Sequence, residues 1–352
     1  MFSFYKKSLP QNRLTRVSMY VIQALVLVVA LIIAVLVSVG KYVAYIDNMP
    51  HEDESIAVGT EEVGIPQFPV GVDPQNKEIA ENPSAELFFE EYLVDENKVL
   101  SAHTSFFRKF LGELALNGWY QNLASVSSRM LVIQSGERKE QIATNFKKIL
   151  KWTDAEKEEF LTRVTEGTVG IEEGVFFPDT YTVSRTATPE DVAELVLERF
   201  ASEVLAHYGA EVDTIVPLEQ ALIVASLLER EAYDFEDMRH ISGVIWNRLF
   251  TDMRLQIDAT LQYVKGSKPH QPWWPKVIPD DKYLVSAFNT YRHEGLPPTA
   301  IANPSLEAIL AALNPSETDC MFYFHDTDGG FHCTVTYEEH VAELKKYYGR
   351  GK

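Results

Sequence analysis

The sequence predicts an α+β protein with a single N-terminal transmembrane helix, and three observations support this fold class. Residues 17–40 form an apolar run without a charged side chain. Further along, several segments repeat apolar residues at helical spacing. Short strand signals stand at residues 129–134 and on both sides of a turn at residues 326–330. Hydrophobic residues make up 46% of the chain and charged residues 24%, which excludes a wholly disordered chain.

The apolar run VSMYVIQALVLVVALIIAVLVSVG is long enough to cross a membrane. About 20 apolar residues span the hydrocarbon core, whereas the apolar stretch of a cleaved signal peptide has only about 7–15. Acidic residues follow the run, and the residues that precede it include the basic side chains Lys6, Lys7, Arg13 and Arg16. The positive-inside rule therefore places residues 1–16 in the cytoplasm and everything after residue 40 outside the inner (cytoplasmic) membrane.

The charge balance and the cysteine count exclude other classes of protein. The chain has 51 acidic and 32 basic residues and a formal net charge of −19, which argues against a nucleic-acid partner. Two cysteines are too few for a Cys-rich zinc module. Cys320 and Cys333 flank the predicted hairpin, but strict pairing puts Cys333 opposite Tyr323, so a disulfide is possible but not favoured.

The part after the membrane segment divides into three stretches. Residues 41–84 contain five prolines and many acids, and we expect a linker. The next stretch combines the strand at 129–134, a turn with Gly136 and an amphipathic helix, which is typical of a small βααβ-type module. Later segments predict helices that start near residues 189, 217 and 235.

The helix at residues 217–232 is apolar almost all round and ends in two acids, so we expect it in a domain core. Glu229 and Glu231 are two residues apart and cannot share a face. Glu231 continues the bulkier apolar face, where desolvation raises the pKa of a carboxyl group, as a general acid requires. The alternative is a structural Glu231 that pairs with Arg248 or Arg254.

Polar residues on loops shaped by Pro and Gly follow this helix, and they could line a cleft for a ligand rich in hydroxyl and amide groups. These loops and the segments near them form a series of seven motifs. The motifs are EGVFFPDTY at 173–181, ALIVASLLERE at 221–231, NRL at 247–249, MRLQIDAT at 253–260, NTY at 289–291, GLPPTAIANP at 295–304 and YFHDTDGGFHCTVTYEEH at 323–340. In this order, over roughly residues 85–348, they resemble the endolytic murein transglycosylases (MltG or YceG-like proteins). These are membrane-anchored enzymes that cut the glycan strands of bacterial peptidoglycan.

The resemblance implies a small LysM-like module near residues 85–165 and a mainly helical catalytic domain with a β-hairpin at 166–352. It implies that Glu231, the second acid of an E-x-E motif, is catalytic. The expected product is a 1,6-anhydro-muramic acid end, formed from the MurNAc-β-1,4-GlcNAc bond without a cofactor or metal. It further implies contact with penicillin-binding peptidoglycan synthases and a role in ending nascent strands.

Four other residues are candidates for substrate binding, namely Gln256, Asp258, Asn289 and Tyr291. Gln256 and Asp258 would position sugars or orient Glu231, and Asn289 and Tyr291 would hydrogen-bond to N-acetyl or hydroxyl groups. For the last two, loop capping is the alternative. The sequence departs from the family pattern at Ala232, Ala259 and Phe288.

Two other functions stay open from the sequence. A muramidase-type hydrolase would use Glu231 and Asp258 as the usual pair of carboxyl groups. A non-catalytic peptidoglycan-binding scaffold would need neither residue for chemistry. His325, His332 and His340 lie close in sequence but lack a zinc-binding spacing, so no metal site is expected.

Overall fold

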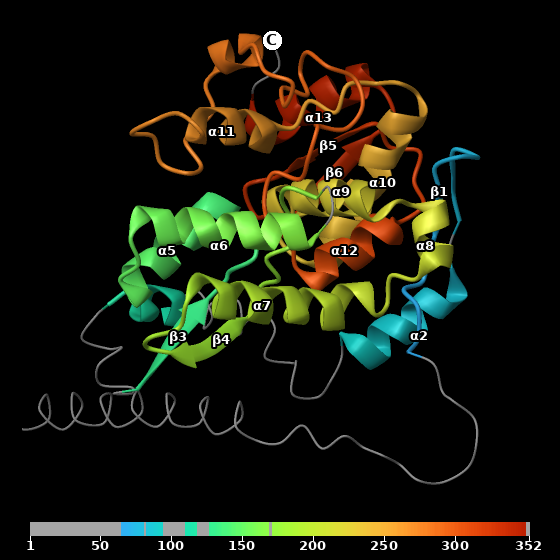
Figure 1. Ribbon diagram of the computed structural model, residues 1–352. Coiled ribbons are helices and arrows are strands. Elements are labelled where there is room, and N and C mark those ends of the chain that lie inside the picture. The colour runs from blue at the N-terminus through green and yellow to red at the C-terminus, as the bar shows by residue number, and fades with distance from the viewer. Residues whose placement is uncertain (1–64, 81, 94–109, 118–126, 169–170, 350–352) are drawn as a thin grey trace, which may run out of the picture.

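The computed structural model describes residues 65–80, 82–93, 110–117, 127–168 and 171–349 (Figure 1). Helices predominate, together with three separate two-stranded antiparallel sheets, so the α+β class is confirmed. The predicted membrane segment, residues 17–40, lies outside the described residues, as does the tail before it. Within the described ranges, no helix combines the length and apolar character needed to span a bilayer.

Three helices form the centre of the fold: α9 (Leu218–Glu231), α10 (Phe235–Phe250) and α12 (Leu306–Leu313). In α9 every residue from Ala221 to Leu228 is buried, as the apolar sequence predicts, and α12 packs along it. The Trp246 indole of α10 donates to the Ala312 carbonyl over 2.9 Å, which satisfies a buried polar atom in the core. These contacts fix the direction of α9 and therefore the position of the acids at its end.

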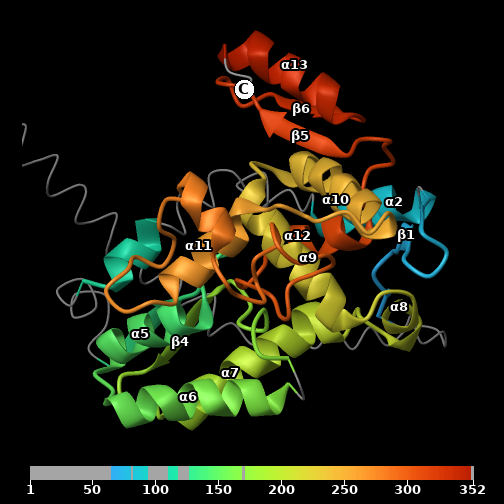
Figure 2. The ribbon, with the colours of Figure 1, turned by 90° about the horizontal axis from the view of Figure 1, so that it is seen from above.

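A βααβ unit packs beside this centre, and it differs in extent from the predicted module. Its elements are β3 (Ser128–Val132), α5 (Lys139–Leu150), α6 (Asp154–Gly167) and β4 (Thr180–Ser184). β3 and β4 pair antiparallel, with Met130 opposite Thr182. The unit therefore extends beyond residue 165, the predicted end of the module, because its second strand is β4. Helix α7 (Pro189–Phe200) packs on α6 (Figure 2). It begins at residue 189, as the sequence predicts, and Thr188 is its N-cap.

The linker predicted at residues 41–84 is too long, because its last part belongs to the folded domain. From residue 65 the chain packs onto the domain, because Phe68 and Val72 are buried and the Gly71 amide donates to the Leu313 carbonyl over 2.9 Å. The elements of this segment and its surroundings are β1 (Val72–Asp73), β2 (Glu78–Ile79), α2 (Pro83–Tyr92), the π-helix η1 (Ala201–Leu205) and α8 (Ala210–Ile215). Helix α2 contacts the centre through Phe89, whose ring lies 5.0 Å from that of Phe235. It is therefore not part of the βααβ unit.

The C-terminal hairpin lies against α10 and carries helix α13 on its outer side (Figure 2). Its elements are β5 (Phe322–His325), β6 (Phe331–Thr334) and α13 (Tyr337–Tyr348). The predicted register is confirmed, since Tyr323 stands opposite Cys333. The expectation against a disulfide is wrong: the chain bends at Met321, and Cys320 bonds to Cys333 with Cα atoms 5.7 Å apart.

Candidate active site

Glu231 is the last residue of α9, and its half-buried carboxylate faces two hydrogen-bond donors. The Tyr323 hydroxyl of β5 donates to Oε2 of Glu231 over 3.1 Å. The backbone amide of Ala259 also donates to this carboxylate. Desolvation nevertheless raises the pKa of Glu231 to about 7, and the charge of Asp258 acts in the same direction. The expected pKa increase is confirmed, so this side chain can hold a proton near neutral pH.

Arg248, the proposed ion-pair partner, does not pair with Glu231. Its Nε donates to the Met321 carbonyl over 2.6 Å, and its Nη1 donates to the Leu255 carbonyl. Among the residues that the structure describes, no Lys or Arg forms an ion pair with Glu231. The structural alternative for Glu231 is therefore not found.

Helix α11 (Asp258–Gly266) starts beside Glu231, and a buried threonine pair holds that start in place. The Ile257 amide donates to Oγ1 of Thr290 over 3.0 Å, and the hydroxyls of Thr260 and Thr290 lie 3.0 Å apart. Because Thr260 also donates to the Ile257 carbonyl, the first turn of α11 is fixed from both sides. This turn supplies the Ala259 amide to Glu231.

Tyr291 and Asp258 lie together at the surface of the site. The Tyr291 hydroxyl donates to Oδ1 of Asp258 over 2.7 Å, and Asp258 is exposed. Burial raises the pKa of Tyr291, and its bond to Asp258 adds to this effect, so it stays a protonated donor. Gln256 is also exposed just before α11, with a positive φ of 52°. Asp258 and Tyr291 therefore lie within electrostatic reach of Glu231, and Gln256 precedes Asp258 by two residues in the chain.

Asn289 lies beneath this surface and is completely buried. Its Nδ2 donates to the carbonyls of Lys282 and Leu284, and its Oδ1 accepts from the Tyr291 amide over 3.0 Å. All of these bonds lie within its own loop. The arrangement matches the loop-capping alternative and makes Asn289 a support for Tyr291.

Tyr323 is the site residue that the sequence reasoning missed. It stands in the segment 323–340 that carries the family resemblance, but nothing in one sequence distinguishes it from other aromatic hairpin residues. Burial raises its pKa well above the usual range, and the neighbouring Glu231 charge contributes, so it remains a neutral donor. The sequence offered only the position of Tyr323 as a clue. The predicted hairpin places it within the strand, opposite Cys333.

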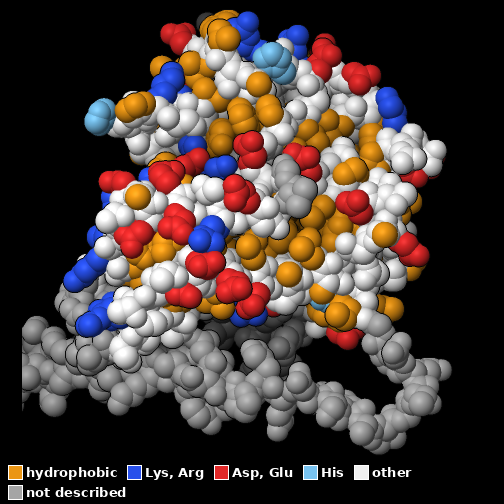
Figure 3. All heavy atoms as spheres, in the orientation of Figure 1, with side chains coloured by type: hydrophobic (Ala, Val, Ile, Leu, Met, Phe, Trp, Pro, Cys, Tyr) orange, Lys and Arg blue, Asp and Glu red, His pale blue; other side chains and the backbone are white. Residues whose placement is uncertain are grey.

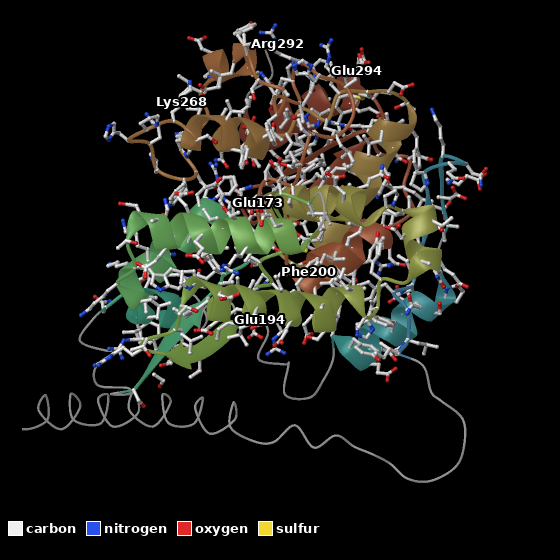
Figure 4. All side chains as sticks on the ribbon, viewed as in Figure 1. Glu173, Glu194, Phe200, Lys268, Arg292 and Glu294 are labelled. Atoms are coloured by element: carbon white, nitrogen blue, oxygen red, sulfur yellow. A yellow bond between two sulfur atoms is a disulfide. The ribbon has the colours of Figure 1, made fainter. Side chains whose placement is uncertain are left out.

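Glu137 and Glu173 are buried carboxyl groups with raised pKa in the contact between the βααβ unit and the rest of the fold. Burial raises the pKa of Glu173 to about 8 and that of Glu137 to about 7. Figure 4 labels Glu173 near the middle of the molecule, where Nδ2 of Asn303 donates to it over 2.7 Å. Oδ1 of Asn303 accepts from the Phe176 amide over 2.9 Å, so this asparagine joins the unit to the catalytic part. None of these groups contacts Glu231 directly.

Comparisons with known proteins identify the family of the chain. The profile of the YceG-like family matches residues 107–346, which include Glu231, Asp258, Tyr291 and Tyr323. This chain belongs to the YceG-like family. A crystal structure of a yceG-like protein from Listeria monocytogenes shares the fold, with a TM-score of 0.53 and 26% identity, over 61% of this chain and 75% of that one.

Two curated relatives of this YceG-like chain are named endolytic murein transglycosylase. The protein of Bacillus subtilis strain 168 is 33% identical over 176 residues, 50% of this chain and 48% of its own length. The protein of Streptococcus pneumoniae strain D39 is 29% identical over 176 residues, 50% of this chain and 32% of its own length. The matched part therefore spans half or less of these relatives.

Proposed function

We propose that this chain is a membrane-anchored peptidoglycan lytic transglycosylase, with Glu231 as its single acid and base. The observation that carries the proposal is the environment of Glu231: a carboxyl group with a pKa of about 7, oriented by Tyr323 and Ala259 and free of an ion pair among the described residues. A general acid works best when its pKa lies near the operating pH. The names of the curated relatives support the same reaction class.

The reaction would proceed with proton transfers at Glu231 only. Protonated Glu231 donates its proton to the bridging oxygen of the MurNAc-β-1,4-GlcNAc bond, and the bond from C1 to that oxygen breaks. The C6 hydroxyl of the same muramic acid attacks C1, and its proton returns to the Glu231 carboxylate. The product is a 1,6-anhydro ring, no water is consumed, and the acid is regenerated.

One observation favours the alternative of a muramidase-type hydrolase. The charge of Asp258 acts on Glu231, and a hydrolase would use a second carboxyl group. Its Oδ1 accepts from the Tyr291 hydroxyl, which suits a residue that orients substrate or Glu231. We therefore infer a positioning role for Asp258 and Gln256, and a substrate-binding role for Tyr291. The products of digestion distinguish the two reactions.

The wider setting of this proposal comes from the sequence. Residues 17–40 would anchor the chain in the inner membrane, with the catalytic domain outside the cytoplasm and the N-terminus inside. We further propose that the βααβ unit is a LysM-like module and that the enzyme ends nascent strands beside penicillin-binding synthases. A topology reporter fused at either end of the chain tests the orientation.

The decisive experiment is digestion of purified peptidoglycan by the full chain in detergent, followed by mass spectrometry. Each anhydro product is lighter by one water than its hydrolysed counterpart. We expect anhydro ends from the wild type and a loss of about 10²–10⁴-fold in rate for Glu231→Gln, the usual contribution of a general acid. Reducing ends would make the chain a hydrolase, and wild-type activity in Glu231→Gln would refute the mechanism.

A further inference from the structure

A cavity of about 460 Å³ opens next to the candidate active site and is lined by three cations and two tyrosines. These residues are Arg254, Lys282, Tyr283, Tyr291 and Arg292. Tyr291 connects the cavity to the site, because its hydroxyl bonds to Asp258, whose charge acts on Glu231. The cavity and the candidate active site therefore share Tyr291.

The cations of this cavity are unusual in so acidic a chain. Acidic residues outnumber basic ones by 51 to 32, and acidic side chains are spread over the face formed by α6 and α7 (Figure 3). Yet Arg254, Lys282 and Arg292 form no ion pair with any acid in the described part of the chain. The nearby Lys265, by contrast, pairs with Asp281 over 2.6 Å. Three unpaired cations around one hollow create a local positive field that attracts an anion.

The loop that carries these cations is held in one conformation. Buried Asn289 donates to the Lys282 carbonyl over 3.1 Å, and Nη1 of Arg292 donates to the Tyr283 carbonyl over 3.0 Å. Nζ of Lys282 lies 4.7 Å from the centre of the Tyr291 ring. Lys282 and Arg292 are therefore ordered before any ligand arrives, which lowers the entropic cost of binding.

We propose that this cavity, the cationic pocket, binds an anionic branch of the glycan strand next to the bond that is cut. The inference rests on the proposed function and names a part of its substrate. The amino sugars of peptidoglycan are neutral, whereas the peptide on the lactyl group of each muramic acid carries free carboxylates. A strand end that is still joined to its carrier carries phosphate. Guanidinium and ammonium groups recognise both kinds of anion, so the shared chemistry is an oxyanion on the strand.

The test compares full-length Lys282→Glu/Arg292→Glu with the wild type in detergent on three substrates. These are peptide-bearing strands, strands whose carboxylates have been converted to amides, and such amidated strands with a terminal pyrophosphate. We expect kcat/KM to fall about tenfold through KM on the substrate that carries the recognised anion, since two exposed charges are reversed. The fall should shrink with added salt, because exposed charges are screened. Loss on peptide-bearing strands alone identifies the carboxylates, and loss on pyrophosphate-bearing strands alone identifies the phosphate.

Lys268→Glu is the matched control, because Lys268 follows α11, does not line the pocket and is labelled away from Arg292 in Figure 4. Arg292→Lys, which keeps the charge, should retain most of the wild-type KM. Equal KM values on all three substrates for the charge-reversal variant and the wild type would overturn the proposal, as would an equal effect of Lys268→Glu.

A binding arm separates failure of this proposal from failure of the proposed function. Affinity for labelled peptide-bearing strands is measured in the Glu231→Gln background, with and without the two charge reversals. Weaker binding with the reversals supports the pocket even if the wild type cuts no bond. If the wild type cuts strands but the reversals change neither affinity nor KM, the pocket is refuted and the enzyme stands. If the chain neither binds nor cuts any strand, both proposals fail.

Discussion

Removing the Tyr323 hydroxyl tests whether its hydrogen bond sets the protonation state of Glu231. The bond favours the ionised carboxylate and partly offsets the effect of burial, and the pKa that results is about 7. In Tyr323→Phe the ring and its packing remain, but the donor is lost. The pKa of Glu231 should therefore rise, and the protonated form should persist to higher pH.

The magnitude follows from the geometry of this bond. Hydrogen bonds to charged groups contribute about 1.5–3 kcal/mol, and one pKa unit corresponds to about 1.4 kcal/mol. The separation of 3.1 Å is longer than the usual O–H···O distance, and Glu231 is only half-buried, so the low end of this range applies. We expect the alkaline limb of the pH–rate profile to move up by about one pH unit.

The assay is kcat/KM for release of anhydro products between pH 5 and 10. The wild type should lose activity as the pH rises through about 7, because Glu231 then loses the proton that it must donate. Tyr291→Phe removes the equivalent hydroxyl from the neighbouring Asp258, so it should leave the position of the limb unchanged. A limb that stays in place or moves down in Tyr323→Phe would refute this account of Glu231.

Three further predictions concern the supports of the site. Thr290→Val should lower the free energy of unfolding by about 1–3 kcal/mol in urea titrations, because the Ile257 amide loses its buried acceptor; an unchanged midpoint would contradict this. Since the folded pKa of Glu173 is about 8, the native state holds more protons than the unfolded state above about pH 4.5, so stability should fall from pH 5 to 8. Glu173→Gln should make that fall shallower in pH-dependent melting, and an identical slope would count against it. Replacing Cys320 and Cys333 by Ser should destabilise the hairpin by up to about 3 kcal/mol. Hydrogen exchange of the variant and of the parent protein under oxidising conditions measures this difference. Equal protection of the hairpin amides in both proteins would show that the disulfide is dispensable.

Local patterns in the sequence predict much of the fold. The apolar run at Ala221 to Leu228 predicts α9, and the Thr188 cap followed by proline predicts the start of α7. The turn at 326–330 predicts the register of β5 and β6. Each of these features is decided by neighbours within a few residues, which one sequence displays directly.

Long-range packing accounts for the errors. Residues 65–80 have the prolines of a linker, and only their bonds to distant segments, such as Gly71 to Leu313, make them part of the domain. Strand β4 has the sequence TYTVS, whose β-branched and aromatic residues suit a strand, but its partner β3 lies far away in the sequence and only the fold shows their pairing. The bend at Met321 brings Cys320 within bonding distance of Cys333, and strict strand pairing cannot represent such a bend.

The site shows the same division between local and distant information. The helical face of Glu231 is readable from its spacing to Val224, Leu227 and Leu228, and the raised pKa confirms that reasoning. The functional roles of Glu231 and its neighbours remain predictions. For Asn289, the residue type suits both a ligand contact and a loop cap, and only its complete burial separates the two.

Arg248 explains why Glu231 keeps a proton although a cation was available to neutralise it. The guanidinium is directed to the carbonyls of Met321 and Leu255, which lie close in sequence to Tyr323 and Ala259, the two donors to Glu231. An ion pair would have stabilised the carboxylate and lowered its pKa. With its donors bound to backbone carbonyls, Arg248 instead holds the segments that orient the acid. The sequence could not reveal this, because backbone carbonyls are present at every residue, and only the fold decides which of them an arginine reaches.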